Sequence, residues 1–572
     1  MQHGEWSVES REIVPLPSDT GGGTMSDADQ GMVDEFLEEI DLVVFAFGAL
    51  LTVGVIAAFF INQSAVTEAI GTVYGWVVEY LNWALLVIVF LIVLFLLFLI
   101  VGPWGKIKMG DEDPEYSFLS FFAMLYSAGF AAGVVFWGPT EALFYYDNPS
   151  PLFGVEGGTT EAIPIAIQQT LFHWALPQLA VFTIMGLAIA YFAYNYEDVP
   201  LRVSSALTPI LGKENLDGPA AKVVDILAVF ATIGGVATSL GFIGSQFIAG
   251  LNYQWGIDLG NVGILLVVTT MTLLFTISMV LGVDRGIRRL SNFNMILFVT
   301  LMLATFILGP TLFLLLLGSQ AMGGMIADFT SMSLYTGTGS DGGTSWMNSW
   351  TVFYWAWALS WSPFAGLFIA RISKGRTVRE VAFTGIGATS AATIPWFTFV
   401  GGTALRYHHN GTADFSSVIA NNTPEISGFI LFDAFPLGTV FMIAFMILVT
   451  TFFITSADSS TLAVSMMTTG GKARPSTINR VFWGVVLGLT AAILMIIGGE
   501  GGTGALQNAV IITGAPFAFV CFLAMLSLIT DFSSSYGRVL LQDETVLIGS
   551  SAKTEPEPES PGPGGPVESD DD

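Results

Sequence analysis

The stretch that decides the fold runs from Trp350 to Glu380 and reads WTVFYWAWALSWSPFAGLFIARISKGRTVRE. Its first part is apolar and rich in tryptophan, whereas its last part carries the basic residues Arg371, Lys374, Arg376 and Arg379. Large aromatic residues recur at helical spacing, which predicts an aromatic stripe along one face of a helix. The members of this stripe are Trp350, Trp357, Trp361, Phe364 and Phe368.

Pro363 lies inside this predicted helix. Proline removes a backbone hydrogen bond and crowds the preceding turn, so we expect a break near Ser360–Ser362. At membrane depth, broken backbone is tolerated where it lines a cavity rather than where it faces lipid. The stretch therefore predicts a helix that borders an internal cavity, with its basic end anchored at the membrane surface.

The composition of the chain is that of a polytopic membrane protein. Of its 572 residues, 53% are hydrophobic and 11% are charged, and the mean hydropathy is +0.68. The single cysteine, Cys521, excludes an intramolecular disulfide and a cysteine-cluster metal site. Two G-x-G-x-x-G strings, at Gly337–Gly342 and Gly499–Gly504, follow no predicted strand, which argues against a dinucleotide site. No catalytic motif is present in the sequence, so we expect a protein that is not an enzyme and has no cofactor.

The net charge of −27 is concentrated at the two ends of the chain, where 11 acidic residues lie in 1–41 and 10 in 531–572. We expect an acidic tail at 1–41, a membrane domain at 42–531 and a second acidic, disordered tail at 532–572. An acidic excess also suits a protein kept soluble in high salt, which predicts a halophilic prokaryote as the source. No basic patch exists, so nucleic acid is not an expected partner.

Twelve apolar segments have the length needed to span a membrane, which predicts an all-α membrane protein. A shorter amphipathic stretch near 320–333 is expected to lie along the outer surface. The twelve segments are 42–61, 77–102, 117–146, 164–194, 222–250, 262–282, 293–317, 347–372, 380–405, 436–467, 480–498 and 505–530.

Basic residues predict the orientation of these segments. Of the 19 Lys and Arg residues, 15 lie in or beside the loops that follow the even-numbered segments, and one, Arg406, follows an odd-numbered segment. Since cytoplasmic loops are enriched in basic residues, both termini are predicted to be cytoplasmic in a multi-pass protein of the cell membrane.

The segments group as two plus five plus five, with repeats near 117–317 and 347–530. Because five is odd, the second set must run inverted relative to the first. Each set opens with an interrupted helix, at Ser127–Gly133 (SAGFAAG) and at Ser360–Gly366 (SWSPFAG). Paired interruptions in inverted halves are the pattern of a transporter binding site.

The 350–380 stretch closely resembles the signature helix of the betaine/choline/carnitine transporter (BCCT) family, WTxFYWAW…SWSPFxGxFxARISxGRxxRE. Residues 127–143, SAGFAAGVVFWGPTEAL, resemble the glycine-rich unwound stretch of that family and its following (F/Y)-G-x-T-E-x-L. Ala131 and Ala132 stand where relatives often carry glycine. The resemblance implies a LeuT-type fold, sodium-coupled uptake of a compatible solute across the lipid bilayer, and a homotrimer.

Asp458 falls well inside a predicted span, where a charge costs about 2.5–3.5 kcal/mol and should be paired or face a polar cavity. Hydroxyl residues surround it, at Thr455, Ser456, Ser459 and Ser460. Hydroxyl oxygens suit sodium, although such side chains also commonly bond to the helix backbone. The resemblance implies a sodium site made by Phe452, Thr455 and Ser456 with the carbonyls of Ser127 and Phe130.

A second sodium site is implied by the family at Thr232 and Phe364. Val236 replaces a threonine that the family uses there, which weakens that expectation. Two further polar residues have plainer interpretations. Glu141 is expected at a helix end near the outer interface, and His173 is expected to be a neutral, hydrogen-bonded core histidine.

Quaternary ammonium groups cannot donate hydrogen bonds, and proteins hold them with aromatic faces. The resemblance implies a solute pocket lined by Trp174, Phe182, Phe130, Trp355, Trp357 and Trp361. Betaine transporters favour Trp, Tyr and Trp where this chain has Leu179, Phe182 and Ala358, so the aromatic cage is incomplete. Glycine betaine is the first expectation, and the alternative is a sodium-independent exchanger or a transporter of an amino acid, ectoine or taurine.

Overall fold

A computed structural model describes residues 27–536 except 130, 258–259, 281–283, 422, 473 and 499–502. Across these residues the chain is helical, with one isolated antiparallel bridge between Lys108 and Thr377. The first helices are α1 Asp27–Glu39, α2 Leu42–Ile61, α3 Gln63–Tyr80, α4 Asn82–Val101, α5 Phe118–Gly129, α6 Ala131–Trp137, α7 Glu141–Asp147, α8 Ala162–Trp174, α9 Leu176–Asn195, α10 Thr208–Leu211, α11 Pro219–Trp255 and α12 Gly260–Val280. The later helices are α13 Asp284–Leu308, α14 Thr311–Ser333, α15 Gly343–Met347, α16 Phe353–Ile372, α17 Val378–Ala382, α18 Thr389–Trp396, α19 Gly402–His409, α20 Ser416–Asn421, α21 Ser427–Asp433, α22 Gly438–Met467, α23 Thr477–Gly498 and α24 Thr503–Ser535.

Short 3-10 and π-helical turns connect these helices. The 3-10 turns are η1 Pro103–Lys106, η2 Pro151–Phe153, η3 Val203–Leu207, η4 Lys213–Asn215 and η8 Pro424–Ile426. The π-helical turns are η5 Asn348–Val352, η6 Phe383–Ala388 and η7 Phe397–Gly401.

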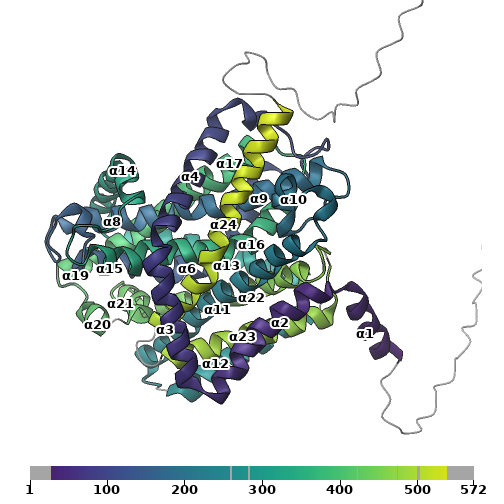
Figure 1. Ribbon diagram of the computed structural model, residues 1–572. Helices are drawn as coiled ribbons and strands as arrows, with labels where there is room; N and C mark the ends of the chain where they lie inside the picture. Colours follow the sequence, from purple (N-terminus) through teal and green to yellow (C-terminus); the bar gives the residue numbers. More distant parts are fainter. Residues whose placement is uncertain are drawn as a thin grey trace, which may run out of the picture.

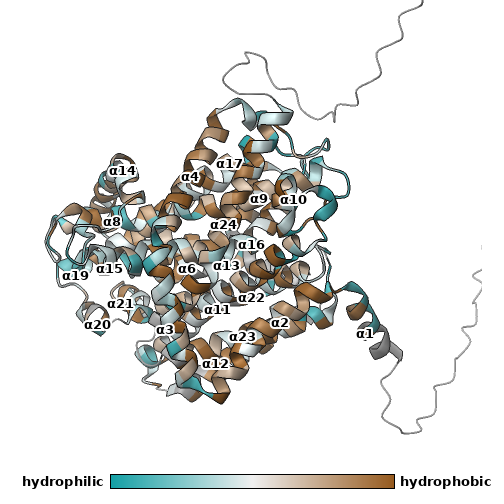
Figure 2. Cartoon of the chain, viewed as in Figure 1, coloured by the Kyte–Doolittle hydropathy of each residue, from teal (hydrophilic) through white to brown (hydrophobic). Residues whose placement is uncertain are grey.

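Nine helices in the described part of the chain are long and apolar enough to cross a membrane. They correspond to α2, α4, α8 with α9, α11, α14, α15 with α16, α22, α23 and α24. The predicted segment at 117–146 is divided into α5, α6 and α7, whereas the segment at 380–405 lies within one continuous helical run, 378–409, in which α- and π-helical turns alternate. Hydrophobic residues predominate in the long helices, whereas hydrophilic residues gather in the loops and around α1 and α10 (Figure 2).

The predicted C-terminal boundary of the 293–317 segment is wrong. The Gly309–Pro310 pair separates α13, which ends at Leu308, from α14, which begins at Thr311. The stretch expected as a short surface segment near 320–333 is the second half of this 23-residue apolar helix. An apolar window passes over a Gly–Pro pair, whereas the backbone cannot, because proline does not continue the preceding helix.

The break predicted at Ser360–Ser362 is also absent, since α16 runs through Pro363 to Ile372. Pro363 has no N–H to donate to the carbonyl of Leu359, four residues earlier. The hydroxyl of Ser362 donates to that carbonyl instead, at 2.8 Å. A side-chain donor thus replaces the missing backbone donor, and the helix continues.

Two other helix interruptions lie at the centre of the molecule. The predicted interruption at Ser127–Gly133 is confirmed as far as the described residues extend, because α5 ends at Gly129 and α6 begins at Ala131. A second one, within the predicted 164–194 segment, was not expected. Pro177 is near the start of α9, and Ala175 separates α8 from α9. The proline ring is incompatible with the backbone of the preceding turn, which explains the break.

Helix α16 is the centre of the bundle and packs against α9, α11 and α24 (Figure 1). Its contact with α9 is close because two glycines face the partner helix. A Cβ atom on Gly366 would lie 2.7 Å from Met185 Cβ, and one on Gly186 would lie 2.4 Å from Ile369 Cγ2. Small residues let apolar helices approach closely, so van der Waals contact holds this pair together.

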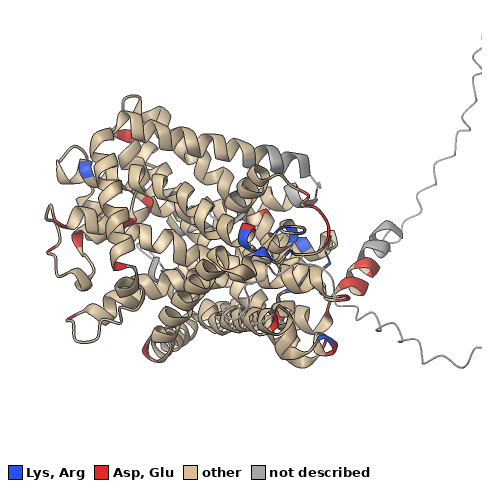
Figure 3. Ribbon diagram, turned by 90° about the horizontal axis from the view of Figure 1, so that it is seen from above, with Lys and Arg blue, Asp and Glu red and all other residues tan. Residues whose placement is uncertain are grey.

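Basic residues after α16 join its end to the end of α4, the following loop and the start of α5. Arg379 donates to the carbonyls of Ile100 and Gly102 at 2.6 and 2.8 Å. Lys374 pairs with Glu112 at 2.8 Å, and Arg376 lies 4.2 Å from the ring centre of Phe121. Figure 3 shows a group of Lys and Arg residues on the side of the molecule from which the acidic N-terminal helix projects.

The end of the predicted 1–41 tail makes ordered contacts. Glu39 accepts hydrogen bonds from the backbone N–H and hydroxyl of Ser476, which precedes α23. Asp41 caps α2 and pairs with Lys222 of α11 at 3.2 Å. Residues 1–26 and 537–572, which include most of the predicted acidic tails, lie outside the described residues.

We predict that Ser362→Ala lowers the thermal unfolding temperature of the purified protein in detergent. The carbonyl of Leu359 would lose its donor, and an unsatisfied buried polar group costs about 1–3 kcal/mol. In a Pro363→Ala background the new backbone N–H can serve the same carbonyl, so Ser362→Ala should cost clearly less there. Equal costs in the two backgrounds would show that the hydroxyl does not have this role.

Candidate solute-binding site

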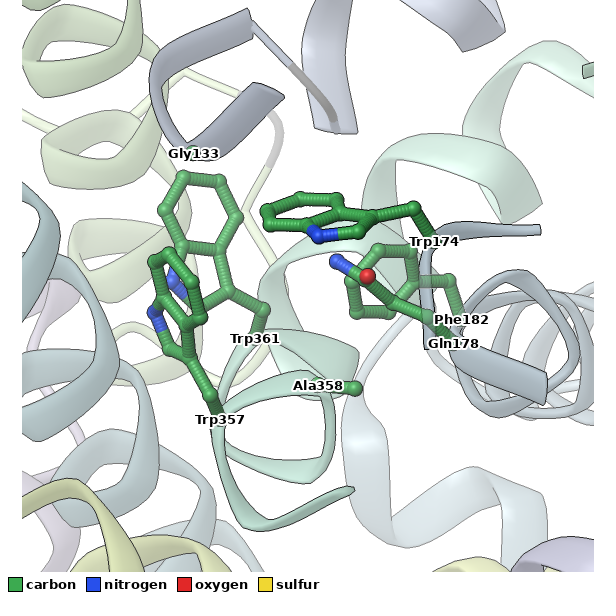
Figure 4. A pocket seen from close by; sticks show the side chains of 7 residues that line it. All are labelled: Gly133, Trp174, Gln178, Phe182, Trp357, Ala358 and Trp361. Carbon is green, nitrogen blue, oxygen red and sulfur yellow. The ribbon is translucent and has the colours of Figure 1, made fainter. Parts of the chain in front are cut away.

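A small cavity lies where α6, α8, α9 and α16 meet at the centre of the bundle. In Figure 4 the rings of Trp357 and Trp361 lie on one side and Trp174 and Gln178 on the other. The complete lining is Gly133, Trp174, Gln178, Phe182, Trp357, Ala358 and Trp361. All seven are uncharged, and four are aromatic.

Ring contacts and one hydrogen bond orient Trp357. Its ring meets Trp174 edge to face, with centroids 5.8 Å apart and an 83° angle, and stacks on Phe353 at 5.5 Å. Its Nε1 donates to Ser239 Oγ of α11 at 3.2 Å. Aromatic pairs prefer such edge and offset geometries, so the indole face is held toward the cavity by packing on both sides.

Glu141 holds the opposite wall of the cavity. Its carboxylate is fully buried (0% exposed), so the expectation of a helix-end group at the interface is wrong. Oε2 accepts hydrogen bonds from the indole Nε1 of Trp174 and, at 2.7 Å, from the hydroxyl of Tyr354. The bend after α6 turns the start of α7 inward, and a sequence pattern at the end of an apolar segment does not reveal that bend.

His173 is the third neighbour of this carboxylate. Its Nδ1 lies 3.1 Å from Glu141 Oε1 and 2.7 Å from the hydroxyl of Tyr145, and its Nε2 lies 3.2 Å from Thr351 Oγ1. Its ring stacks on Tyr354 at 4.6 Å. The prediction of a buried, hydrogen-bonded core histidine is confirmed, and the residue supports the pocket wall from behind.

The structure places four of the six predicted solute-binding residues in the lining: Trp174, Phe182, Trp357 and Trp361. Trp355 is also buried, but its ring packs edge to face on Phe172 and His173 and does not line the cavity. Phe130 lies outside the described residues. Helix periodicity explains the placement of Trp355, because it is two residues from Trp357 and so points to another side of α16.

Gln178 and Gly133 are lining residues that the sequence reasoning did not assign to the pocket. Gln178 precedes Phe182 by one helical turn, and a lone amide on the aromatic face of an apolar helix was the available signal. Gly133 is needed for space, because a Cβ atom there would lie 2.8 Å from the ring tips of both Trp174 and Trp357. Ala358 lines the cavity without contributing an aromatic ring, and Leu179 is buried without lining the cavity.

The predicted sodium ligands lie on α22, which packs against α5 and α6 beside their interruption. Thr455 Oγ1 donates to backbone carbonyls of its own helix, those of Thr451 and Phe452, and accepts from Asn294 Nδ2 at 3.3 Å. Ser456 is buried. Ser127 lies in a stretch whose side chains are not described, and Phe130 lies outside the described residues altogether. The backbone-bonding alternative therefore describes Thr455 here, although its hydroxyl oxygen, which accepts once from Asn294, keeps a second lone pair for a cation.

Asp458 is buried, and Arg480 of α23 approaches it at 3.9 Å, as the expectation of a paired charge requires. The residues of the implied second sodium site lie on two helices that pack together, α11 and α16. The hydroxyl of Thr232 lies 3.9 Å from Met467 Sδ, and Phe364 packs edge to face on Trp361 at 5.6 Å. Both side chains are buried.

Comparison with known proteins shows the family of this chain. The model of the betaine/carnitine/choline family of transporters matches residues 43–536. This chain belongs to that family. The glycine betaine transporter OpuD of Bacillus subtilis (strain 168) is 39% identical over 461 residues, which cover 80% of this chain and 88% of that protein.

Two further relatives of this BCCT member have informative names. Glycine betaine transporter 1 of Vibrio parahaemolyticus is 35% identical, covering 85% of this chain and 92% of that protein. The betaine/ectoine transporter LcoP of Corynebacterium glutamicum is 34% identical, covering 86% and 78%. The family is one of membrane transporters rather than enzymes, and the relatives carry small solutes.

We predict that Gly133→Ala weakens binding of glycine betaine about tenfold, because the added methyl group meets two indole rings and overpacking costs about 1–3 kcal/mol. Binding is measured by tryptophan fluorescence of the purified protein. The matched control is Gly323→Ala on α14, where nothing lies within 4 Å of the new Cβ atom. If both variants bind like the parent protein, the ring tips do not border the bound solute.

Proposed function

We propose that this BCCT member is a secondary active transporter that takes up a compatible solute, with glycine betaine as the first candidate, in symport with sodium. The observation that carries this proposal is the convergence of three indoles and a phenyl ring on one buried, uncharged cavity. A desolvated aromatic face stabilises a quaternary ammonium group by about 2 kcal/mol or more. The cavity offers four such rings.

The polar groups of the cavity favour a zwitterion over a solute with net positive charge. Trp361 Nε1 is buried and has no partner among the described residues, so it can donate to a solute carboxylate. The nearest carboxylate, Glu141, is occupied by Trp174 and Tyr354 behind the wall rather than offered to the cavity. Choline would therefore lack a counter-ion that betaine carries within itself.

Sodium coupling is proposed from the hydroxyls of Thr455 and Ser456 beside the interruption between α5 and α6. With Phe452 and the backbone of Ser127 and Phe130, they would supply the oxygen ligands that a hard cation requires. Each charge that enters down a membrane potential contributes about 2.3 kcal/mol per 100 mV, which is enough to concentrate a neutral solute. Thr232 and Phe364 are the proposed place of a second sodium ion.

The same proposal includes the membrane arrangement. Twelve spans, organised as two plus an inverted five-plus-five repeat of LeuT type, would bring the interruption between α5 and α6 and the continuous helix α16 together at the cavity. The distribution of Lys and Arg supports cytoplasmic termini. A homotrimer is proposed from the family resemblance.

The second candidate is a transporter or sodium-independent exchanger of a zwitterion without a quaternary nitrogen. Ala358 and Gln178 favour it, because a methyl group and an amide stand in a lining where a full cage would present more aromatic surface. A solute with N–H groups could donate to Gln178 Oε1, which has no partner among the described residues. Ectoine, taurine and proline are the solutes to compare.

The deciding experiment is uptake into proteoliposomes with and without an inward sodium gradient. Labelled glycine betaine should accumulate only with the gradient, and unlabelled betaine should compete better than choline, carnitine, ectoine, taurine or proline. Competition by an amino acid or a sulfonate, with none by trimethylammonium compounds, would replace the first candidate by the second.

We predict that Trp361→Ala weakens betaine affinity roughly 30-fold, which corresponds to about 2 kcal/mol for one desolvated aromatic face. The measurement is the half-saturating betaine concentration in the uptake assay. The control is Trp76→Ala. Trp76 lies on α3, its side chain is 55% exposed, and it does not line the cavity. A similar effect of both substitutions would argue against a specific role for Trp361.

We also predict that Thr455→Ala combined with Ser456→Ala abolishes sodium-stimulated uptake while the protein stays folded, since few packing atoms are lost. The control is Thr450→Ala with Thr451→Ala on the same helix, whose hydroxyls bond to the carbonyls of Met446 and Ile447. Unchanged sodium dependence in the first double variant would remove this site from the mechanism.

A further inference from the structure

A group of buried polar side chains without partners lies away from the central cavity, where η8 and α21 meet α11. Both amide atoms of Gln246 and the hydroxyl of Ser427 have no hydrogen-bond partner among the described residues, and both side chains are fully buried. Oε2 of Glu425 is likewise buried and unpartnered within that part of the chain. Buried polar groups are normally satisfied, so their shared lack of partners needs an explanation.

Contacts between the helices indicate that these three residues lie at a similar position along the axis of α11. η8 packs against both α6 and α11, and Thr140 Oγ1 donates to the carbonyl of Pro424 at 3.1 Å. On α11, a Cβ atom added at Gly250, one turn after Gln246, would lie 2.3 Å from Cζ of Phe429 in α21. Gln246 precedes Gly250 by four residues, and Glu425 precedes Phe429 by four.

These equal offsets indicate that Glu425 and Ser427 pass beside Gln246 as the two segments run along each other. A contact at the end of α6 agrees with this alignment. The ring of Trp137 packs edge to face on the ring of Phe242 in α11, with centroids 5.7 Å apart. Phe242 is one turn before Gln246. Along α11, α6 is thus met near Phe242 and α21 at Gly250, and η8 also packs against this helix.

The chemistry of the group is that of a cation site. The three side chains offer a carboxylate, a hydroxyl and an amide oxygen, all hard ligands. Burial raises the pKa of Glu425, because a buried carboxylate is costly without a compensating charge. Within the described residues Glu425 forms none of the ion pairs found. One carboxylate balances one positive charge, which favours a monovalent over a divalent ion.

We propose that Glu425, Ser427 and Gln246 bind one alkali cation, of which sodium is the probe, at the junction of η8, α21 and α11. This site is separate from the coupling site proposed on α22 and does not depend on it. A bound ion would tie the η8–α21 segment to α11 through three oxygen ligands. Waters and additional backbone oxygens complete the coordination of such ions.

The test is a sodium titration of the full-length purified protein in detergent, without solute. Sodium chloride replaces N-methylglucamine chloride at constant ionic strength, and the thermal unfolding temperature is followed, since a ligand that binds only the folded state stabilises it. The parent protein should be stabilised by sodium. In the Thr455→Ala, Ser456→Ala background, which removes the proposed coupling site, Glu425→Gln should shift the sodium dependence to roughly tenfold higher concentration or remove it, because a charged ligand is lost.

The matched control is Asp433→Asn, at the far end of α21, where the carboxylate is exposed and accepts from Tyr253. It should titrate like the parent protein. A Thr455→Ala, Ser456→Ala variant separates the two sites, because it should keep the sodium response that Glu425→Gln loses. The proposal and the coupling mechanism can therefore fail independently.

Gln246→Met provides a second test that survives poor folding of the Glu425 variant. Methionine has a similar volume but no amide, so a ligand role predicts a weaker sodium response. If the unpartnered amide is only a local strain or a water site, Gln246→Met should be more stable without sodium and its sodium titration should be unchanged. That result, or a titration of Glu425→Gln that matches its Thr455→Ala, Ser456→Ala background, would overturn the proposal.

Discussion

A backbone inside a membrane has no water to satisfy its N–H and C=O groups, and this constraint shapes the centre of the protein. At Pro363 the chain meets it with a side chain, because the hydroxyl of Ser362 takes the place of the missing N–H. Helix α16 can then stay regular and hold Trp357, Ala358 and Trp361 on one surface. At Pro177 no side-chain donor replaces the missing N–H among the described residues, and the chain divides into α8 and α9. The two prolines thus have opposite results, and both results position aromatic residues at the cavity.

A buried carboxylate organises the other wall. Glu141 accepts from Trp174 and Tyr354 and lies beside His173, so residues of α7, α8 and α16 are joined through one group. A buried charge is tolerated only when hydrogen bonds surround it, and this arrangement satisfies that condition with donors from different helices. Trp174 therefore presents its ring to the cavity while its polar edge is occupied behind it. The cavity stays uncharged, which suits a zwitterionic solute.

Close packing and polar anchoring divide the work elsewhere. Gly186 and Gly366 bring α9 and α16 into contact, and this contact fixes the distance across the cavity. Arg376 and Arg379 tie the end of α16 to the loop between α4 and α5, where the chain leaves the apolar core. The buried polar atoms of Glu425, Ser427 and Gln246 differ from both of these arrangements. Glu425 Oε2, Ser427 Oγ and both amide atoms of Gln246 have no hydrogen-bond partner among the described residues.

The amino-acid sequence by itself was sufficient to predict the helical membrane class, the family, the interruption near Gly129 and four of the aromatic lining residues. These features depend on composition, on local backbone chemistry or on a long motif, all of which are readable along the chain. Tertiary structure decided the rest. Whether Pro363 breaks its helix depends on where the Ser362 hydroxyl points, and whether Trp355 lines the cavity depends on how α16 is rotated against α8. Glu141 shows the limit most clearly, since its role depends on donors 33 and 213 residues away that only the folded chain brings together.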